Sequence, residues 1–420
     1  MKKTTETWLA ADRAHCWHPF TDQSLWAAPA HEPLVLERGE GVWLYDSEGR
    51  KYLDANSSIW TTIHGHAHPE INAAIAAQLG RVAHTSYLGF ANPLASELAE
   101  KLCGFFPKKV LPRCFFSDDG STALEVALKM ATQFFHQNGE PARAQIVAFE
   151  QSYHGDTLGA ASIGGVGRFQ KGVRGYETQQ VSAVAELDSL DANEIAAVVI
   201  EPKIQGVNEM RVWPEGMLRD LRVWCDAKGV LLVYDEVMTG FGRTGKMFAC
   251  QHEEAFPDFL CLAKGLSGGY LPLAATLTTE RLYEGFLGPK KTFYYGHSFT
   301  GNQLGCAAAL ASLALFERDG FWTELEEKIA LFEAKLHKLE RLSEVFAVRQ
   351  LGLVAGVEFR QKNGEHFPDR GARGKMICEK LKQRKILTRP ILDTVVLMPP
   401  LSITLDELRW LLQEFEEVCG

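Results

Sequence analysis

Residues 230–245, VLLVYDEVMTGFGRTG, contain a short apolar run that ends in a carboxylate and leads into a glycine-rich loop. A helix-like stretch precedes this run at residues 217–227, and another apolar run follows at residues 259–262. Short apolar runs bounded by turn residues are typical of strands buried inside a sheet. The alternation of such runs with helices predicts βαβ units around a mostly parallel sheet.

The same alternation continues over much of the chain, from about residue 69 to residue 312. Further helix-like stretches occupy residues 70–78, 95–103 and 121–133, and further apolar runs occupy residues 114–116, 145–149 and 196–200. We therefore predict an α/β fold in which residues 66–312 form a large domain with a mostly parallel sheet.

The pattern of predicted helices and strands changes after Gly320. A long charged amphipathic helix is predicted at residues 321–341, and it is followed by strand-like segments at 346–349, 354–359 and 394–398 and by a helix from Leu405. These features predict a small α+β domain at residues 313–420. The N-terminal segment, residues 1–65, contains two short strands at 42–46 and 51–54, and we expect it to pack with the small domain.

Composition narrows the class of protein. The chain has 420 residues, enough for two cores, and a formal net charge of -9, which gives no basic surface for nucleic acid. Its nine cysteines show no C-x-x-C pair, and this predicts reduced thiols in the cytoplasm. No apolar run approaches the roughly 20 residues of a membrane helix, and the first eight residues do not resemble a signal peptide.

Three predicted strands run into polar side chains, namely Glu201, Asp235 and Lys264. In open α/β sheets, ligands bind outside the carboxyl ends of the strands, so these side chains are expected to converge on one crevice. Pyridoxal 5'-phosphate (PLP) explains them best. A buried carboxylate at Asp235 keeps its pyridine nitrogen protonated, and the amine of Lys264 binds its aldehyde and then carries a proton. Taken singly, each residue could equally be a surface charge.

Other residues could complete such a site. Residues 117–122 lead into a helix, so Gly120 and Ser121 are candidates to hold a phosphate, although an ordinary N-cap with Glu125 behind it fits as well. Tyr153 could place its ring over the cofactor or be an ordinary loop aromatic. Arg243 lies in the glycine-rich loop and could contact the substrate, but a solvated arginine is the commoner case.

These motifs resemble class III, fold type I PLP-dependent aminotransferases. The most specific matches are residues 234–237, 240–245, 263–269, 200–202 and 205–206. The resemblance covers nearly the whole chain and implies a homodimer with its active sites at the subunit interface. It places Gly120 and Ser121 on the phosphate, Tyr153 against the cofactor, Asp235 on the pyridine nitrogen and Lys264 on the aldehyde. It also implies that Gly296, His297 and Ser298 come from the partner subunit, with Ser298 on the phosphate.

Within the class, the chain is most similar to biotin-pathway members, which convert 8-amino-7-oxononanoate to 7,8-diaminononanoate. The matching segments are residues 17–21, 57–60, 63–66, 153–157, 388–390 and 397–400. The resemblance implies that Arg389 pairs with the carboxylate of the oxononanoate. It also implies that Phe20, Ile59, Trp60 and Val396 line the substrate pocket.

The substrate side departs from the usual pattern. Those members commonly have tyrosine where this chain has Phe20 and Val396, and tryptophan where it has Ile59. The amino donor therefore stays open between S-adenosylmethionine, the default of this group, and lysine.

Two other functions are weighed against this one. The first is a class III aminotransferase acting on an omega-amino acid or a diamine. The second is a metal-dependent hydrolase, suggested by the alternating His64, His66 and His68; no acidic partner motif accompanies them, and we expect no metal site.

Overall fold

The computed structural model describes residues 4–172 and 174–420, and its centre is a seven-stranded sheet with the order β4-β12-β11-β10-β7-β5-β6. All neighbouring strands in it are parallel except β12, which is antiparallel to both β4 and β11. The bounds are β4 Arg113–Ser117, β5 Gln145–Phe149, β6 Thr178–Val181, β7 Ile195–Ile200, β10 Leu231–Asp235, β11 Phe259–Leu262 and β12 Ala274–Thr278. The predicted α/β fold with a mostly parallel sheet is confirmed.

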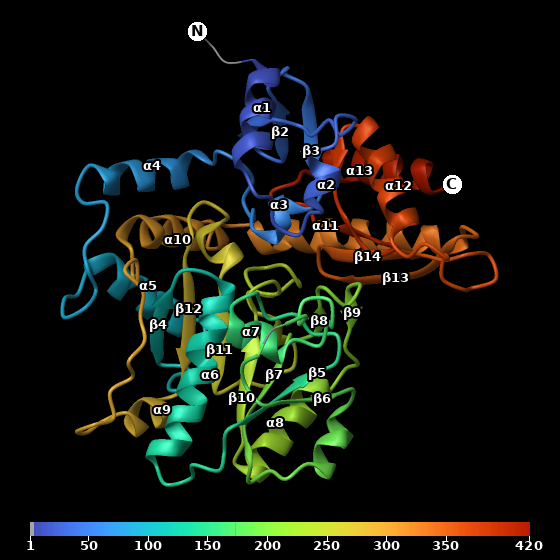
Figure 1. Cartoon of the computed structure of the whole chain (residues 1–420). Coiled ribbons are helices and arrows are strands. Elements are labelled where there is room, and N and C mark those ends of the chain that lie inside the picture. The colour runs from blue at the N-terminus through green and yellow to red at the C-terminus, as the bar shows by residue number, and fades with distance from the viewer. Residues whose placement is uncertain (1–3, 173) are drawn as a thin grey trace.

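Helices cover this sheet because its central strands are apolar on both faces (Figure 1). Helix α6, Gly120–Gln137, packs across β12, β11 and β7, and α8, Met217–Lys228, packs on β10. The other helices of this part are α4 Pro69–Leu79, α5 Pro93–Gly104, α7 Leu158–Ile163, α9 Glu280–Gly285 and α10 Gln303–Phe316, with short 3₁₀ turns at Val184–Ser189, Ala249–His252 and Lys264–Ser267. Strands β8, Ile204–Gln205, and β9, Arg211–Val212, form a separate hairpin.

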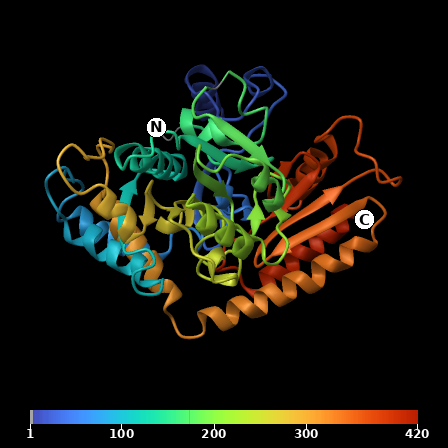
Figure 2. The same cartoon turned by 90° about the horizontal axis from the view of Figure 1, so that it is seen from below.

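The C-terminal part forms a second lobe beside the large sheet (Figure 2). Its antiparallel sheet has the order β13-β14-β17-β16, and the helices α11 and α12 both pack on α13. The bounds are α11 Phe321–Leu336, a 3₁₀ turn His337–Arg341, β13 Val345–Leu351, β14 Val354–Phe359, α12 Ala372–Gln383, β15 Ile386–Leu387, β16 Pro390–Ile391, β17 Thr394–Leu397 and α13 Leu405–Cys419.

The N-terminal strands join this lobe through hydrogen bonds. Strands β1, Leu36–Glu40, β2, Trp43–Asp46, and β3, Lys51–Asp54, form a sheet whose fourth strand is β15. Figure 1 accordingly shows the blue N-terminal elements beside α12 and α13. Three short helices complete this part, α1 Thr5–His15, α2 Gln23–Trp26 and α3 Ser57–Trp60. The first three residues of the predicted 1–65 segment lie outside the described ranges, and the three domain boundaries stay a prediction.

No helix within residues 4–172 and 174–420 has both the length and the apolar character needed to cross a membrane.

Candidate active site

The carboxyl ends of three neighbouring strands meet at one cavity of about 450 Å³. Glu201 follows β7, Asp235 ends β10, and Lys264 follows β11 after a single residue; β10 is paired with both of the other strands. All three side chains line the cavity, together with Gly120, Ser121, Tyr153 and Trp60. The fold thus brings together residues that are up to 204 positions apart in the chain, from 60 to 264.

Asp235 is buried and is held by a histidine that the sequence did not single out. Its Oδ2 lies 2.8 Å from His154 Nδ1, and its Oδ1 accepts the backbone N–H of Val237 at 3.1 Å. The ring of His154 is fully buried, and its Nε2 has no partner among the described residues. A carboxylate held in this way keeps a fixed orientation toward the cavity, which suits a group that must stay charged beside a ligand nitrogen.

Lys264 is partly buried, and its ammonium group has no hydrogen-bond acceptor within the described chain. Its Nζ lies 4.9 Å from the centre of the Trp60 ring. Burial lowers the pKa of Lys264, and the nearby carboxylates of Asp235 and Glu201 oppose that shift. An amine that loses its proton more easily is a better nucleophile toward an aldehyde.

The glycines after Lys264 allow a close approach between two segments of backbone. A Cβ on Gly265 would lie 2.9 Å from a side-chain carbon of Ile63, and one on Gly269, whose φ is +85°, would lie 3.0 Å from the backbone of Thr61. Glycine is favoured at position 269 because a side chain there would push the two backbone segments apart and would be strained at this positive φ. The loop that carries Lys264 is therefore seated directly on residues 61–63.

The N-terminus of α6 points its first amides at the cavity. Asp119 is the N-cap: its side chain accepts from Thr122 N at 2.9 Å, and the Thr122 hydroxyl lies 3.0 Å from Asp119 N. The amides of Gly120 and Ser121 have no acceptor in the part of the chain that the structure describes. A helix N-terminus with free amides attracts an anion. Glu125, the alternative partner considered above, instead accepts from the backbone N–H of Gly159 at 2.8 Å.

Tyr153 lies at the cavity and connects it to the N-terminal segment. Its ring is 5.4 Å from the ring of Phe169, which in turn is 5.7 Å from the ring of Phe20. The Phe20 side chain is 62% exposed, so it lies at the rim of this aromatic row. Phe169 was not predicted, because nothing in its local sequence indicates a contact with residue 20.

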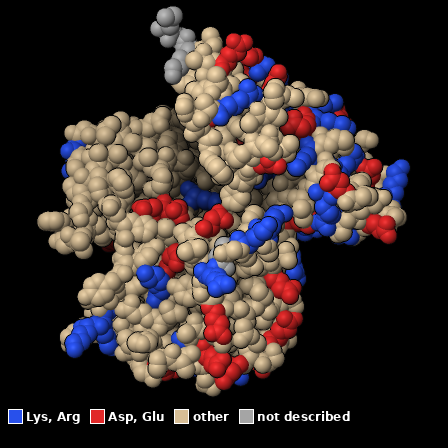
Figure 3. Space-filling model, viewed as in Figure 1, with Lys and Arg blue, Asp and Glu red and all other residues tan. Residues whose placement is uncertain are grey.

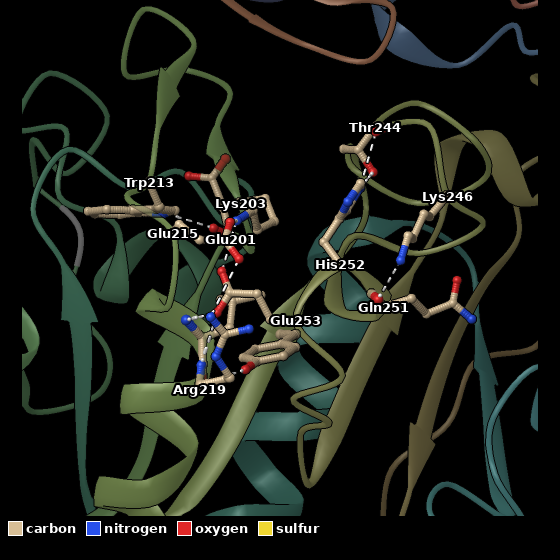
Figure 4. A network of polar contacts seen from close by, with 12 residues as sticks. Glu201, Lys203, Trp213, Glu215, Arg219, Thr244, Lys246, Gln251, His252 and Glu253 are labelled. Atoms are coloured by element: carbon tan, nitrogen blue, oxygen red, sulfur yellow. Dashed lines mark hydrogen bonds and ion pairs between the residues drawn. The ribbon is translucent and has the colours of Figure 1, made fainter. Parts of the chain in front are cut away.

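Glu201 connects two loops of the cavity. Its carboxylate accepts the backbone N–H of Tyr153 at 3.1 Å and that of Gly206 at 2.8 Å. Burial raises the pKa of Glu201 to about 7, and the nearby Asp235 adds to this shift. Figure 4 shows the scaffold behind it, in which Trp213 Nε1 donates to Glu201 O at 3.0 Å. In the same scaffold, Lys203 pairs with the fully buried Glu253 at 2.8 Å.

Several predicted substrate residues lie outside the cavity lining. Arg243 is fully buried, and it donates to Pro399 O at 2.7 Å and to Thr62 O at 3.0 Å, so in this chain it joins two segments of backbone. Arg389 is exposed and makes no ion pair with any described residue. Val396 is buried in one apolar cluster with Trp60 and Met238, and its N–H donates to Arg389 O at 3.3 Å. That bond places the backbone of Arg389 next to this cluster.

The loop containing Gly296, His297 and Ser298 reaches the α6 N-terminus of its own chain. His297 Nδ1 lies 2.6 Å from Asp118 Oδ2, whereas Gly296 and Ser298 are exposed. A role for this loop at the partner's phosphate stays a prediction.

The three alternating histidines have separate partners. His64 Nε2 lies 3.1 Å from the Ser312 hydroxyl, and His66 Nε2 lies 3.0 Å from Asp54 Oδ2. The backbone N–H of His68 donates to the Tyr270 hydroxyl. Among the described residues, no group of three or more His, Cys, Asp or Glu side chains is arranged to hold a metal ion.

A phosphorylated pyridine aldehyde fits the residues present. The amides of Gly120 and Ser121 would hold the phosphate, and Gly155 lets its loop pack directly on Ser121, since a Cβ on Gly155 would lie 2.1 Å from Ser121 Oγ. Asp235 supplies the carboxylate, Lys264 supplies an amine, and His154 Nε2 has no partner within residues 4–172 and 174–420. These residues thus match the phosphate, the pyridine nitrogen and the aldehyde of PLP.

Comparison with known proteins decides the family. The aminotransferase class-III profile matches residues 26–419. The chain belongs to the class-III aminotransferases. A Geobacter sulfurreducens relative of this class, named adenosylmethionine-8-amino-7-oxononanoate aminotransferase, is 42% identical over 98% of this chain and 97% of its own. The crystal structure of the Methanocaldococcus jannaschii enzyme of the same name superposes with a TM-score of 0.94 at 39% identity, over 99% of this chain and 98% of that one.

The cofactor follows from the same class. An amine transaminase from an uncultivated Pseudomonas species, solved in its PLP-bound form, superposes with a TM-score of 0.89 at 32% identity. It covers 96% of this chain and 98% of its own. PLP is accordingly the cofactor that the class implies for this aminotransferase, and the resemblance drawn from the sequence motifs is confirmed.

Proposed function

We propose that this class-III aminotransferase uses PLP to transfer an amino group to 8-amino-7-oxononanoate, which yields 7,8-diaminononanoate for biotin synthesis. The use of PLP is supported by one observation: Lys264, Asp235 and the α6 N-terminus line the same cavity. The substrate half is supported by the names of relatives that match nearly the whole chain.

Bound PLP supplies an aldehyde that condenses with amines and a protonated ring that accepts the electrons of the substrate carbanion. Asp235 holds the proton on the ring nitrogen, and His154 fixes the orientation of that carboxylate. Lys264 would hold the aldehyde through its amine, and that amine, whose pKa is lowered by burial, would carry the proton that transamination moves once it is free. Gly120 and Ser121 hold the phosphate through backbone amides.

Both substrates use one pocket, so the donor must leave as its keto product before the acceptor enters. This order predicts ping-pong kinetics. Arg389 is proposed to bind the carboxylate of the acceptor, a role that is supported by its exposed guanidinium, which has no ion-pair partner among the described residues. Trp60, together with Val396 behind it, provides an apolar wall for the carbon chain of the acceptor.

The donor is proposed to be S-adenosylmethionine, with lysine as the alternative. The side chains of Phe20 and Ile59 are 62% and 45% exposed, which leaves both available to contact an incoming donor. Phenylalanine at position 20 gives no hydroxyl for a polar donor to contact. That difference keeps lysine as the competing donor, and a class III aminotransferase acting on an omega-amino acid or a diamine stays the alternative function.

A homodimer is part of the proposal. Figure 3 shows a lobe over α4 and α10 with few charged side chains, and α10 contains no charged residue. A large uncharged surface of this kind is common at permanent subunit interfaces. A cytoplasmic location is proposed as well, on the composition of nine cysteines without paired motifs.

The test of the proposal is a turnover assay of the PLP-loaded enzyme with 8-amino-7-oxononanoate and each donor in turn. Formation of 7,8-diaminononanoate with one donor supports the proposal and names that donor. Transamination of omega-amino acids without turnover of 8-amino-7-oxononanoate would contradict it.

A further inference from the structure

Helix α3 is a left-handed turn. Ser57, Ser58, Ile59 and Trp60 have φ values of 46°, 48°, 66° and 67°, and none of them is glycine. The backbone N–H of Trp60 donates to Asn56 O at 2.9 Å, and that of Thr61 donates to Ser57 O at 2.9 Å. A left-handed turn is disfavoured for every L-residue and persists only where its surroundings fix it.

Asp54 is the buried anchor of this turn. Its Oδ1 accepts the backbone N–H groups of Ser58 at 3.0 Å and Asn56 at 3.3 Å, and its Oδ2 accepts from the Ser58 hydroxyl at 2.7 Å. Burial raises the pKa of Asp54, but hydrogen bonds from His66 and Ser58 outweigh it and leave the pKa below its ordinary value. The carboxylate therefore stays charged and accepts all of these bonds.

His66 fixes the other side of the Asp54 carboxylate. Its Nε2 lies 3.0 Å from Asp54 Oδ2. The backbone of His66 is paired with Gly41 in both directions, and a Cβ on Gly39 would lie 2.6 Å from His66 Cβ. The ring is thus held against the N-terminal sheet, so the anchor at Asp54 does not move independently of β1–β3.

The handedness of the turn decides where its side chains point. Trp60 enters the cavity, where its ring lies 4.9 Å from Lys264 Nζ, and a Cβ on Gly206 would lie 3.1 Å from that ring. Ile59, one position earlier, stays 45% exposed. A turn of the opposite hand would carry these two side chains in other directions, since φ of each residue would change sign.

We propose that Asp54 is a positioning residue for substrate specificity, because it locks the left-handed turn that presents Trp60 and Ile59 to the donor and acceptor. This inference rests on the proposed function, since it assigns the pocket wall of that same reaction. It requires no contact between Asp54 and any substrate. Loss of the anchor should therefore weaken substrate binding and leave the cofactor in place.

The experiment compares Asp54→Ala with Asp46→Ala in the PLP-loaded enzyme. Asp46 is a matched control, since it is also buried and accepts backbone N–H groups, from Glu48 and Arg50, but it holds a turn away from the cavity. Asp54→Ala is expected to raise KM for the acceptor on the order of tenfold, with kcat changed by less than about threefold and the visible PLP band retained. Asp46→Ala is expected to leave KM unchanged.

A second substitution separates positioning from simple destabilisation. Glycine adopts positive φ without strain, so Asp54→Ala/Ser58→Gly should recover most of the lost KM. The proposal would be overturned by a wild-type KM in Asp54→Ala or by an equal rise of KM in both aspartate variants. It would also be overturned if KM of Asp54→Ala/Ser58→Gly stayed as high as that of Asp54→Ala. If Asp54→Ala does not fold, Ser58→Ala is compared with Ser58→Gly. Both lose the hydroxyl bond to Asp54, so a higher KM in the alanine variant supports the proposal and equal values overturn it.

Failure of the proposed function is recognised in the wild-type enzyme, which would then not transaminate 8-amino-7-oxononanoate. The variants are in that case compared by the concentration of amine donor at which half of the PLP absorbance is converted to that of the amine form. The same order of variants is expected there, and its absence overturns the role of Asp54 independently.

Discussion

Replacing Gly155 with alanine should destroy the phosphate site with a single methyl group. A Cβ at position 155 would lie 2.1 Å from Ser121 Oγ and 2.9 Å from Ser121 Cα, whereas unbonded heavy atoms pack at about 3.5 Å. A new Ser121 rotamer moves neither Cα nor Cβ, and the Cβ would lie 2.6 Å from the new methyl group, so the first turn of α6 must shift by about 0.9 Å. The φ of +119° at position 155 is also strained for alanine.

The expected magnitude follows from the bonds that this shift breaks. Two amides of the α6 N-terminus would lose their geometry toward the phosphate, and a hydrogen bond to a charged group contributes roughly 1.5–3 kcal/mol. The affinity for PLP should therefore fall roughly a hundredfold or more. The measurement is a titration of apoenzyme with PLP, followed by the visible absorbance of the lysine-bound cofactor.

Gly139→Ala is the matched control for this prediction. Gly139 has a φ of +98°, but a Cβ there would meet no atom of the described residues within 4 Å. It should lower stability by roughly 1–3 kcal/mol through backbone strain and leave the affinity for PLP unchanged. Wild-type affinity in Gly155→Ala, or an equal loss in both variants, would refute the assignment of the α6 N-terminus to the phosphate.

Three further predictions concern the chemistry, pH dependence and specificity. Lys264→Ala should abolish turnover but retain PLP binding through Asp235 and the α6 amides. The control Lys246→Ala, at an exposed lysine, should stay active. Turnover by Lys264→Ala would show that Lys264 takes no part in the mechanism. Burial raises the pKa of Glu201 to about 7 from an ordinary 4.5, so its contribution to stability is complete below pH 4.5 and is lost as pH rises through 7. The Tm of wild type minus that of Glu201→Gln should therefore decrease from about pH 5 to about pH 8, and a constant difference would contradict the shift. Arg389→Ala should raise KM for the acceptor roughly tenfold or more and leave the affinity for PLP unchanged. The control Arg384→Ala breaks exposed ion pairs with Glu414 and Glu417 and should leave KM unchanged. Equal KM values in the two variants would exclude Arg389 from substrate binding.

The central strands could be predicted because each is a continuous apolar run. Strands β5 and β11 have the predicted bounds, and β10, Leu231–Asp235, lies in the apolar run at the start of residues 230–245 and includes Asp235. Strand β12 was missed because Ala274–Thr278 mixes small and polar residues, and its strand character comes from antiparallel pairing with β4 and β11. Strand β6, Thr178–Val181, was missed because three of its four residues are polar.

The cofactor-binding residues could be predicted from the sequence for a topological reason. Asp235 and Lys264 follow apolar strands, and parallel strands place such residues at one edge of a sheet. The arrangement of the substrate-binding residues could not be predicted in the same way. The left-handed turn at residues 57–60 contains no glycine or asparagine, so its local sequence gives no sign of positive φ. The buried position of Arg243 between Thr62 and Pro399 depends on segments far apart in the chain.

The most direct test of the central claim is an absorbance spectrum of the purified enzyme with PLP, recorded before and after adding S-adenosylmethionine or lysine. The account predicts a visible band from PLP bound to Lys264, which one donor converts to the shorter-wavelength band of the amine form of the cofactor. A protein that shows no such band after addition of PLP would contradict the assignment of Lys264 and Asp235.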